Sequence, residues 1–262
     1  MDTQSSLSQI PMKSNKTFLS IKETFKEAWQ DVHGFKGTFW LALFIIFVIL
    51  LTFGSIQSLL TQFQTTNASP FQHAPLNILI LSGLISIISN IVNALLSDGL
   101  YYIALRRTNN LPILSRMIFT PFQSPYLLKL LAVLLIKYLI VMVYVGVILS
   151  CTFLMPHTEQ WRIALISIYV ISTLLIIIIM FRLLLSELII LDKKQDAWSA
   201  ITLSFNTTRG YLLRLFCIVI LQILIILLSV IPLGIGLIWS LPLGYLIVPV
   251  IYKKLIGISM TE

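Results

Sequence analysis

Residues 161–191 read WRIALISIYVISTLLIIIIMFRLLLSELIIL, a run in which only Arg162, Arg182 and Glu187 carry a charge. A helix that crosses a membrane needs about 20 mostly apolar residues, and this run is long enough. The whole chain has the same character: 58% of its 262 residues are hydrophobic and 11% are charged, and the mean hydropathy is +0.96. Soluble domains carry about 25% charged residues. The composition excludes a cytosolic enzyme, a secreted domain and a disordered chain, and it indicates an all-α membrane protein.

Further apolar runs of spanning length lie on both sides of this one. The last two are separated by only five residues, where Pro232 and Gly234 favour a tight hairpin over one long helix. We therefore predict six transmembrane helices arranged as three hairpins, with five spans as the main alternative. The predicted spans are Thr38–Ser55, Leu76–Ile103, Leu127–Cys151, Trp161–Leu191, Tyr211–Val230 and Gly236–Tyr252.

The basic residues are distributed unevenly about these spans. With six spans, sixteen of the eighteen Lys and Arg residues fall on one side, Arg162 falls on the other, and Lys137 lies inside the third span. Cytoplasmic segments of membrane proteins collect Lys and Arg. The distribution predicts that both termini are cytoplasmic. It also explains the net charge of +8 without a nucleic-acid partner.

An amphipathic segment precedes each odd-numbered span. In each segment, aromatic and aliphatic residues recur at helical spacing, which predicts helices lying in the cytoplasmic interface. Tyr126-Leu-Leu-Lys-Leu also parallels Tyr211-Leu-Leu-Arg-Leu. This match suggests an internal repeat, although any span that enters from the cytoplasm tends to begin with an aromatic residue and a cation. The three segments are residues 17–32, 111–122 and 196–208.

The same pattern gives the domain organisation. A single membrane domain, residues 17–256, is preceded by a disordered cytoplasmic N-terminus, residues 1–16, and followed by a cytoplasmic tail, residues 257–262. Each repeat is an interfacial helix followed by a transmembrane hairpin, in the same orientation. The predicted pseudo-repeats are residues 17–107, 108–194 and 195–256.

Polar side chains recur along one face of the second predicted span. Their spacing of three or four residues places all of them on the same side of a helix. Because polar groups in lipid need partners, we expect this face to point into the helix bundle, either for hydrogen bonds between helices or as a groove for a headgroup or small solute. The candidate groove residues are Ser82, Ser86, Asn90, Asn93 and Ser97.

Four charged residues fall within or near the predicted spans, where charge is costly. Arg182 and Glu187 are five residues apart, about 140° around a helix, so they are better placed to bond other helices than each other. Lys137 has Asp98 or Glu187 as candidate partners. We therefore expect an intramembrane ion cluster of Asp98, Lys137, Arg182 and Glu187, with a structural role favoured over a transport or proton path.

Motifs for catalysis or cofactor binding are not found in the sequence. It contains no Walker loop, no His-Glu-x-x-His motif and no nucleophile elbow. His33, His73 and His157 are far apart, which makes a metal site improbable. We expect no catalytic residues, no metal and no cofactor. The expected partners are membrane lipids and either a second copy of the chain or another membrane protein.

Several motifs resemble a family of bacterial membrane proteins. They are Gly99 followed by Arg106-Arg107, the stretch from Arg182 to Asp192, and Ala200-x-x-x-Ser204-x-x-x-Thr208-Arg209-Gly210. Together they resemble the YciC-like six-span inner-membrane proteins and the membrane domain fused to some glycerophosphodiester phosphodiesterases. The resemblance covers about residues 17–256. Met155-Pro-His157 departs from the family's Pro-Gly turn, and the phosphodiesterase domain is missing, so no catalytic activity is implied.

These observations lead to two functional hypotheses. The first is a non-enzymatic scaffold, or a protein of envelope and lipid homeostasis, in the bacterial inner membrane. The second is a small transporter or lipid-handling protein that uses the polar face of the second span. An open polar cavity that reaches Asn90 and Asn93 favours the second, and a dry, packed bundle favours the first.

Overall fold

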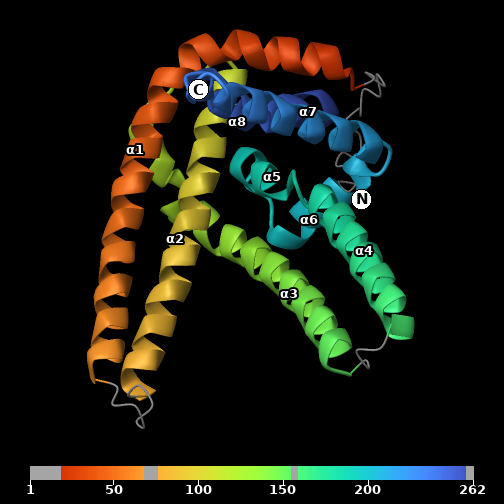
Figure 1. Cartoon of the computed structure of the whole chain (residues 1–262). Coiled ribbons are helices and arrows are strands. Elements are labelled where there is room, and N and C mark those ends of the chain that lie inside the picture. Colours follow the sequence, from red (N-terminus) through yellow and green to blue (C-terminus); the bar gives the residue numbers. More distant parts are fainter. Residues whose placement is uncertain (1–18, 68–75, 155–158, 258–262) are drawn as a thin grey trace, which may run out of the picture.

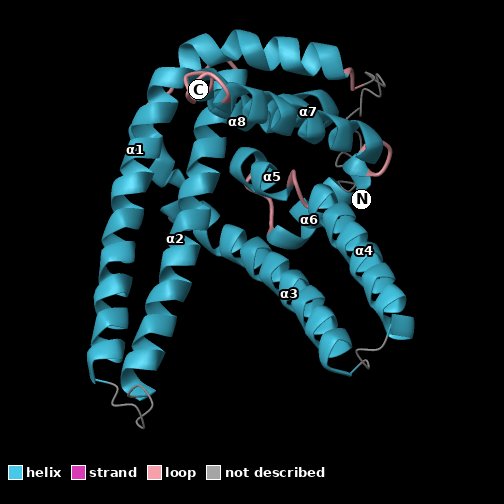
Figure 2. Cartoon of the chain, in the orientation of Figure 1, coloured by secondary structure: helices cyan, strands magenta, loops and turns pink. Residues whose placement is uncertain are grey.

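The computed structural model describes residues 19–67, 76–154 and 159–257, and every regular element in these ranges is a helix (Figures 1 and 2). This confirms the all-α prediction. The predicted disordered segment, residues 1–16, and residues 258–262 of the predicted tail lie outside the described residues. The elements are α1 (Ile21–Asn67), α2 (Leu76–Thr108), the 3-10 helix η1 (Ser115–Phe122), α3 (Ser124–Leu154), α4 (Glu159–Arg182), α5 (Ser186–Lys193), α6 (Ala197–Thr208), α7 (Leu212–Val230) and α8 (Leu237–Leu255).

Five segments of these helices are long and apolar enough to cross a membrane. They comprise α1, α2, α3, α4 together with α5, and α7, and they leave out α8. In the most apolar windows of α2, α3 and the α4–α5 segment, only 6% of the residues are buried inside the protein. Such outward-facing apolar surface suits contact with lipid rather than water. The multi-pass membrane character is thus supported, whereas the sixth span stays a prediction.

Helix α1 combines the first predicted interfacial segment and the first predicted span in one continuous helix. The helix continues through Gly34, whose missing side chain leaves room for the guanidinium of Arg107 to pack against it. Val32, Phe35 and Phe39 are fully buried at helical spacing. Figure 1 shows the first part of α1 lying across the top of the molecule before the helix turns downward beside α2.

The second predicted interfacial helix is shorter than the sequence indicated. It forms η1, which begins at Ser115 and contains Pro121, whose missing N–H disfavours a longer α-helix. Ile118 of η1 is fully buried, and its backbone packs so closely on Gly99 of α2 that no Cβ fits there. The third predicted segment, residues 196–208, matches α6 closely.

The fourth predicted span, Trp161–Leu191, is not one helix. Helix α4 ends at Arg182, a turn follows, and α5 begins at Ser186. The hydroxyl of Ser204 in α6 donates to the Arg182 carbonyl at 2.6 Å, while the Ser186 N–H bonds to Leu183 O. The Arg182 carbonyl therefore has a tertiary partner in place of the next helical turn. Most residues of α5 are buried against the rest of the protein.

Helix α8 packs along the first part of α1 in the opposite direction. Trp40 donates to the carbonyl of Ile238 near the start of α8, and Lys254 near its end lies 3.3 Å from Glu27. A turn that includes Leu233 and Gly234 with positive φ connects α7 to α8. Figure 1 shows α7 and α8 across the upper part of the molecule, whereas α3, α4, α2 and the rest of α1 extend downward. The third hairpin is therefore not aligned with the other two.

Candidate functional site

Ion pairs gather where α8 and the end of α2 meet the first part of α1. Glu27 lies 3.2 Å from Lys253 and 3.3 Å from Lys254. Arg107 donates to the carbonyl of Asp31 at 3.2 Å. We call the first part of α1, the last turns of α2, η1, α5, α6 and α8 the platform. These contacts fix the first part of α1 to α8 and to the end of α2 across long sequence separations.

The start of α3 is also fixed to the platform. Lys129 donates to the carbonyl of Lys194 at 2.6 Å and lies 3.3 Å from the Asp196 carboxylate. Lys194 caps α5 in the left-handed conformation. A single ammonium thus holds the connection between α5 and α6 against α3.

The predicted ion cluster forms in part. Lys137 of α3 bonds to Oε1 of Glu187 in α5 at 2.5 Å, with about a fifth of each side chain exposed. Asp98 of α2 is buried and within electrostatic range of both. The Lys137–Glu187 pair therefore lies near Asp98, where α2, α3 and α5 approach one another.

Arg182 does not belong to this cluster, contrary to the prediction. Its guanidinium lies over the ring of Phe205 in α6, 5.2 Å from the ring centroid. Its Nε is buried and has no hydrogen-bond partner among the described residues. The helix break after Arg182 explains the difference, because Glu187 belongs to a separate helix whose direction the sequence did not reveal.

The polar face of α2 does not point into a packed helix bundle, contrary to what was predicted for the candidate groove residues. Asn90 and Asn93 are exposed, and Ser82, Ser86 and Ser97 are half-buried. Asn90 donates to the carbonyl of Ser86, and Ser97 donates to the carbonyl of Asn93. The Asn90 amide and the Ser97 hydroxyl are thus bonded to carbonyls of their own helix. Ser86 and Asn90 also line a groove of about 240 Å³ between α1 and α2, together with Ser89 and with Gln57 of α1.

An open groove separates this part of α2 from α3. Its volume is about 550 Å³, and it is lined by Ile87, Asn90 and Ile91 of α2 and by Leu131, Leu134, Leu135 and Tyr138 of α3. Asn90 supplies the only amide in this lining. Figure 1 shows α3 leaning away from α2 along its length. The groove is open to the side and mainly apolar, which suits an acyl chain better than a polar solute.

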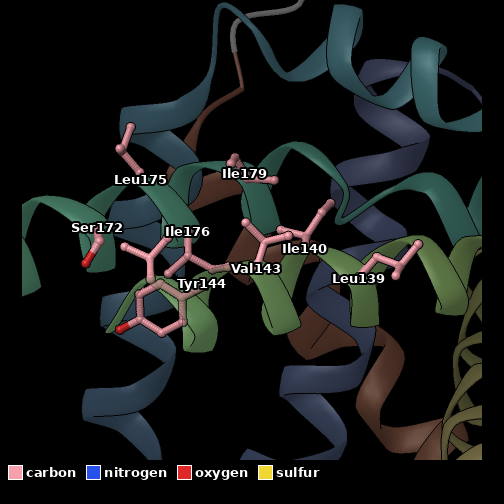
Figure 3. Close-up of a pocket in the computed structure, with 9 residues that line it drawn as sticks. Leu139, Ile140, Val143, Tyr144, Ser172, Leu175, Ile176 and Ile179 are labelled. Atoms are coloured by element: carbon pink, nitrogen blue, oxygen red, sulfur yellow. The ribbon is translucent and has the colours of Figure 1, made fainter. Parts of the chain in front are cut away.

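A second groove of about 490 Å³ lies between α3 and α4 (Figure 3). Val143 and Ile176 lie between the two helices in this view. Of the predicted groove residues, Asn90 lines the groove between α2 and α3. The groove between α3 and α4 was not predicted, because apolar residues facing a groove and apolar residues facing lipid have the same composition. The lining residues are Leu139, Ile140, Val143, Tyr144, Val147, Ser172, Leu175, Ile176 and Ile179.

Two further polar contacts between helices were missed by the sequence reasoning. The Tyr144 and Thr173 hydroxyls of α3 and α4 are 2.9 Å apart, and Gln222 of α7 donates to the carbonyl of Ser240 in α8 at 2.8 Å. A polar residue in an apolar run is the only signal that marks them. Within the described ranges, no group of three or more His, Cys, Asp or Glu residues is placed to hold a metal ion.

Comparison of the chain with models of protein families, with curated proteins and with solved structures finds no match.

Proposed function

We propose that this chain is a non-enzymatic integral protein of the bacterial inner membrane that binds membrane lipid and acts in envelope or lipid homeostasis. The observation that carries the proposal is the contrast between the two ends of the molecule. The platform is tied by ion pairs, whereas α2, α3 and α4 diverge from it and leave two lateral, mainly apolar grooves. A rigid base with open apolar grooves suits the binding of acyl chains.

The groove beside Asn90 distinguishes lipid handling from solute transport. A polar path requires several polar groups along the groove, and the groove between α2 and α3 offers only Asn90 and Tyr138. The more polar groove between α1 and α2 is smaller, at about 240 Å³. Asn93 is exposed but does not line it. Lipid handling is therefore the better supported form of the second hypothesis. The resemblance to YciC-like proteins agrees with the proposed location.

We further propose six spans with both termini in the cytoplasm. In this arrangement the first part of α1, the last turns of α2, η1, α6 and the end of α8 lie at the cytoplasmic surface, where their basic residues meet anionic lipid headgroups. Two exposed tryptophans support the placement of these elements at the membrane surface. Trp29 of α1 and Trp198 of α6 are 48% and 76% exposed, as expected for side chains that anchor a protein in the interface.

Native mass spectrometry tests the proposed function. The full chain, reconstituted in nanodiscs of phosphatidylglycerol and phosphatidylethanolamine, is released in the gas phase at increasing collision energy. We expect one or two phospholipids to stay bound after the bulk lipid has been stripped. Release of the protein without any lipid, at an energy that leaves it folded, would contradict lipid binding. Retention of another membrane protein in place of lipid would favour the scaffold hypothesis.

A further inference from the structure

The groove between α3 and α4 has an apolar lining whose polar atoms are already satisfied. The Tyr144 hydroxyl pairs with Thr173, and the Ser172 hydroxyl donates to the carbonyl of Tyr169. Leu139 and Val143, on the open side, are 57% and 67% exposed. An occupant therefore finds no free polar partner inside the groove itself, and it must be apolar.

One end of this groove leads to an unpaired charge. Ile179 is the last lining residue on α4, and Arg182 follows it by three residues, about 4.5 Å along the helix axis. Leu175 and Arg182 are seven residues apart and so share one face of α4. Arg182 thus follows the lining at the end of α4, where its guanidinium lies against Phe205 of α6.

Arg182 has no anionic partner among the described residues. The nearby carboxylate in sequence, Glu187, is bonded to Lys137. The ring of Phe205 covers one face of the guanidinium, and Nε is buried without an acceptor. A buried N–H without an acceptor is costly, and a guanidinium is suited to bind phosphate through two parallel hydrogen bonds. The Arg182 guanidinium therefore lacks an anionic hydrogen-bond acceptor among the described residues, and a phosphate group would supply one.

The position of this charge matches the level of lipid headgroups. Phe205 and Trp198 are seven residues apart on α6 and share a face, and Trp198 is 76% exposed. Exposed tryptophans mark the membrane interface. A phosphate at Arg182 therefore lies at interface depth, with the groove extending from it toward the membrane interior.

We infer that the groove between α3 and α4 binds one acyl chain of a glycerophospholipid whose phosphate is held by Arg182. This inference rests on the proposed lipid-binding function and assigns it a site and a ligand class. The acyl chain fills the apolar groove of Figure 3. The headgroup phosphate accepts hydrogen bonds from the guanidinium, which Phe205 holds in place by stacking.

The test measures retained lipid in nanodiscs of phosphatidylglycerol that also contain diacylglycerol with the same acyl chains. Wild-type protein should retain phosphatidylglycerol in preference to diacylglycerol. Arg182→Gln should lower phosphatidylglycerol retention about tenfold, the factor expected when one charge-assisted hydrogen bond is lost, and Arg182→Lys should restore part of it. Arg209→Gln, which removes an exposed cation at the end of α6, is the matched control and should retain lipid as wild type does.

Ile176→Trp tests the groove without changing the charge. It places a larger side chain between α3 and α4 and should lower retention although Arg182 is intact. Ile176→Trp therefore still tests the proposed lipid site if the Arg182→Gln variant does not fold. Unchanged retention and lipid preference in folded Arg182→Gln, or in Ile176→Trp, would overturn the site while leaving lipid binding in place. Absence of retained lipid in wild-type protein would instead overturn the proposed function as well.

Discussion

The hydroxyl of Tyr252 donates a hydrogen bond of 2.7 Å to Oδ2 of Asp192, and both residues are buried. The bond joins the end of α8 to α5, elements 60 residues apart in the chain. Together with the ion pairs of Glu27, this bond holds α8 against both α1 and α5.

Tyr252→Phe should destabilise the protein. It removes the hydroxyl but leaves the Asp192 carboxylate buried, and loss of one partner from a buried hydrogen bond to a charged group costs about 1–3 kcal/mol. We expect a lower thermal unfolding temperature in detergent. Tyr138→Phe is the control, because Tyr138 is 43% exposed and its hydroxyl has no hydrogen bond to a described residue. An equal effect of both changes would mean that the bond to Asp192 adds no stability.

Lys137→Leu should be more damaging than Glu187→Gln. Without Lys137, the Glu187 carboxylate loses its bonded cation close to the buried Asp98, and breaking a buried ion pair in this way costs about 3 kcal/mol. Without the Glu187 charge, Lys137 still has Asp98 within range, so we expect a cost of at most about 1 kcal/mol. Unfolding in denaturant or by heat measures both.

The double variant separates pairing from packing. If Lys137 and Glu187 stabilise the fold mainly through each other, adding Glu187→Gln to Lys137→Leu should recover part of the lost stability, because one of the two opposed carboxylates is removed. Additive losses would show that the two residues act independently. A harmless Lys137→Leu would refute a structural role for the cluster.

The sequence predicts some of the helices well because hydropathy reports contact with lipid directly. The predicted Leu76–Ile103 lies within α2, and the predicted Leu127–Cys151 and Tyr211–Val230 nearly coincide with α3 and α7. The break after Arg182 could not be predicted in this way. Leu183, Leu184 and Leu185 are as apolar as a span requires, and the hydroxyl that bonds to the Arg182 carbonyl comes from Ser204, in another helix.

The sequence likewise predicts only part of the candidate site. The need of a lysine in an apolar run for an anion left Asp98 and Glu187 as candidate partners of Lys137, and the structure pairs Lys137 with Glu187. The number of charges in a region, however, does not determine their directions, so Arg182 was grouped with residues that it does not contact. Likewise, the spacing of Asn90 and Asn93 gave their common face of α2 but not what that face meets.

Gly99→Ala should destabilise the junction of α2 and η1. A Cβ at this position meets the backbone of Ile118, which cannot move without shifting η1, and overpacking of this kind costs about 1–3 kcal/mol. Gly83→Ala in the same helix is the matched control, since nothing lies within 4 Å of its added Cβ. Alanine should there be neutral or stabilising by up to about 1 kcal/mol. Gly99→Ala should therefore lower the thermal unfolding temperature, whereas Gly83→Ala should leave it unchanged or raise it.

Both termini should be accessible only from the cytoplasmic side, and α8 decides this outcome. With five spans the termini lie on opposite sides of the membrane, whereas with six they lie on the same side. Lys253 and Lys254 pair with Glu27 of α1, so the end of α8 lies beside the beginning of the chain, and Lys and Arg favour the cytoplasmic side. In intact cells, a membrane-impermeant reagent should label neither an N-terminal nor a C-terminal tag, but should label a tag inserted after residue 70. External labelling of the C-terminal tag alone would establish five spans.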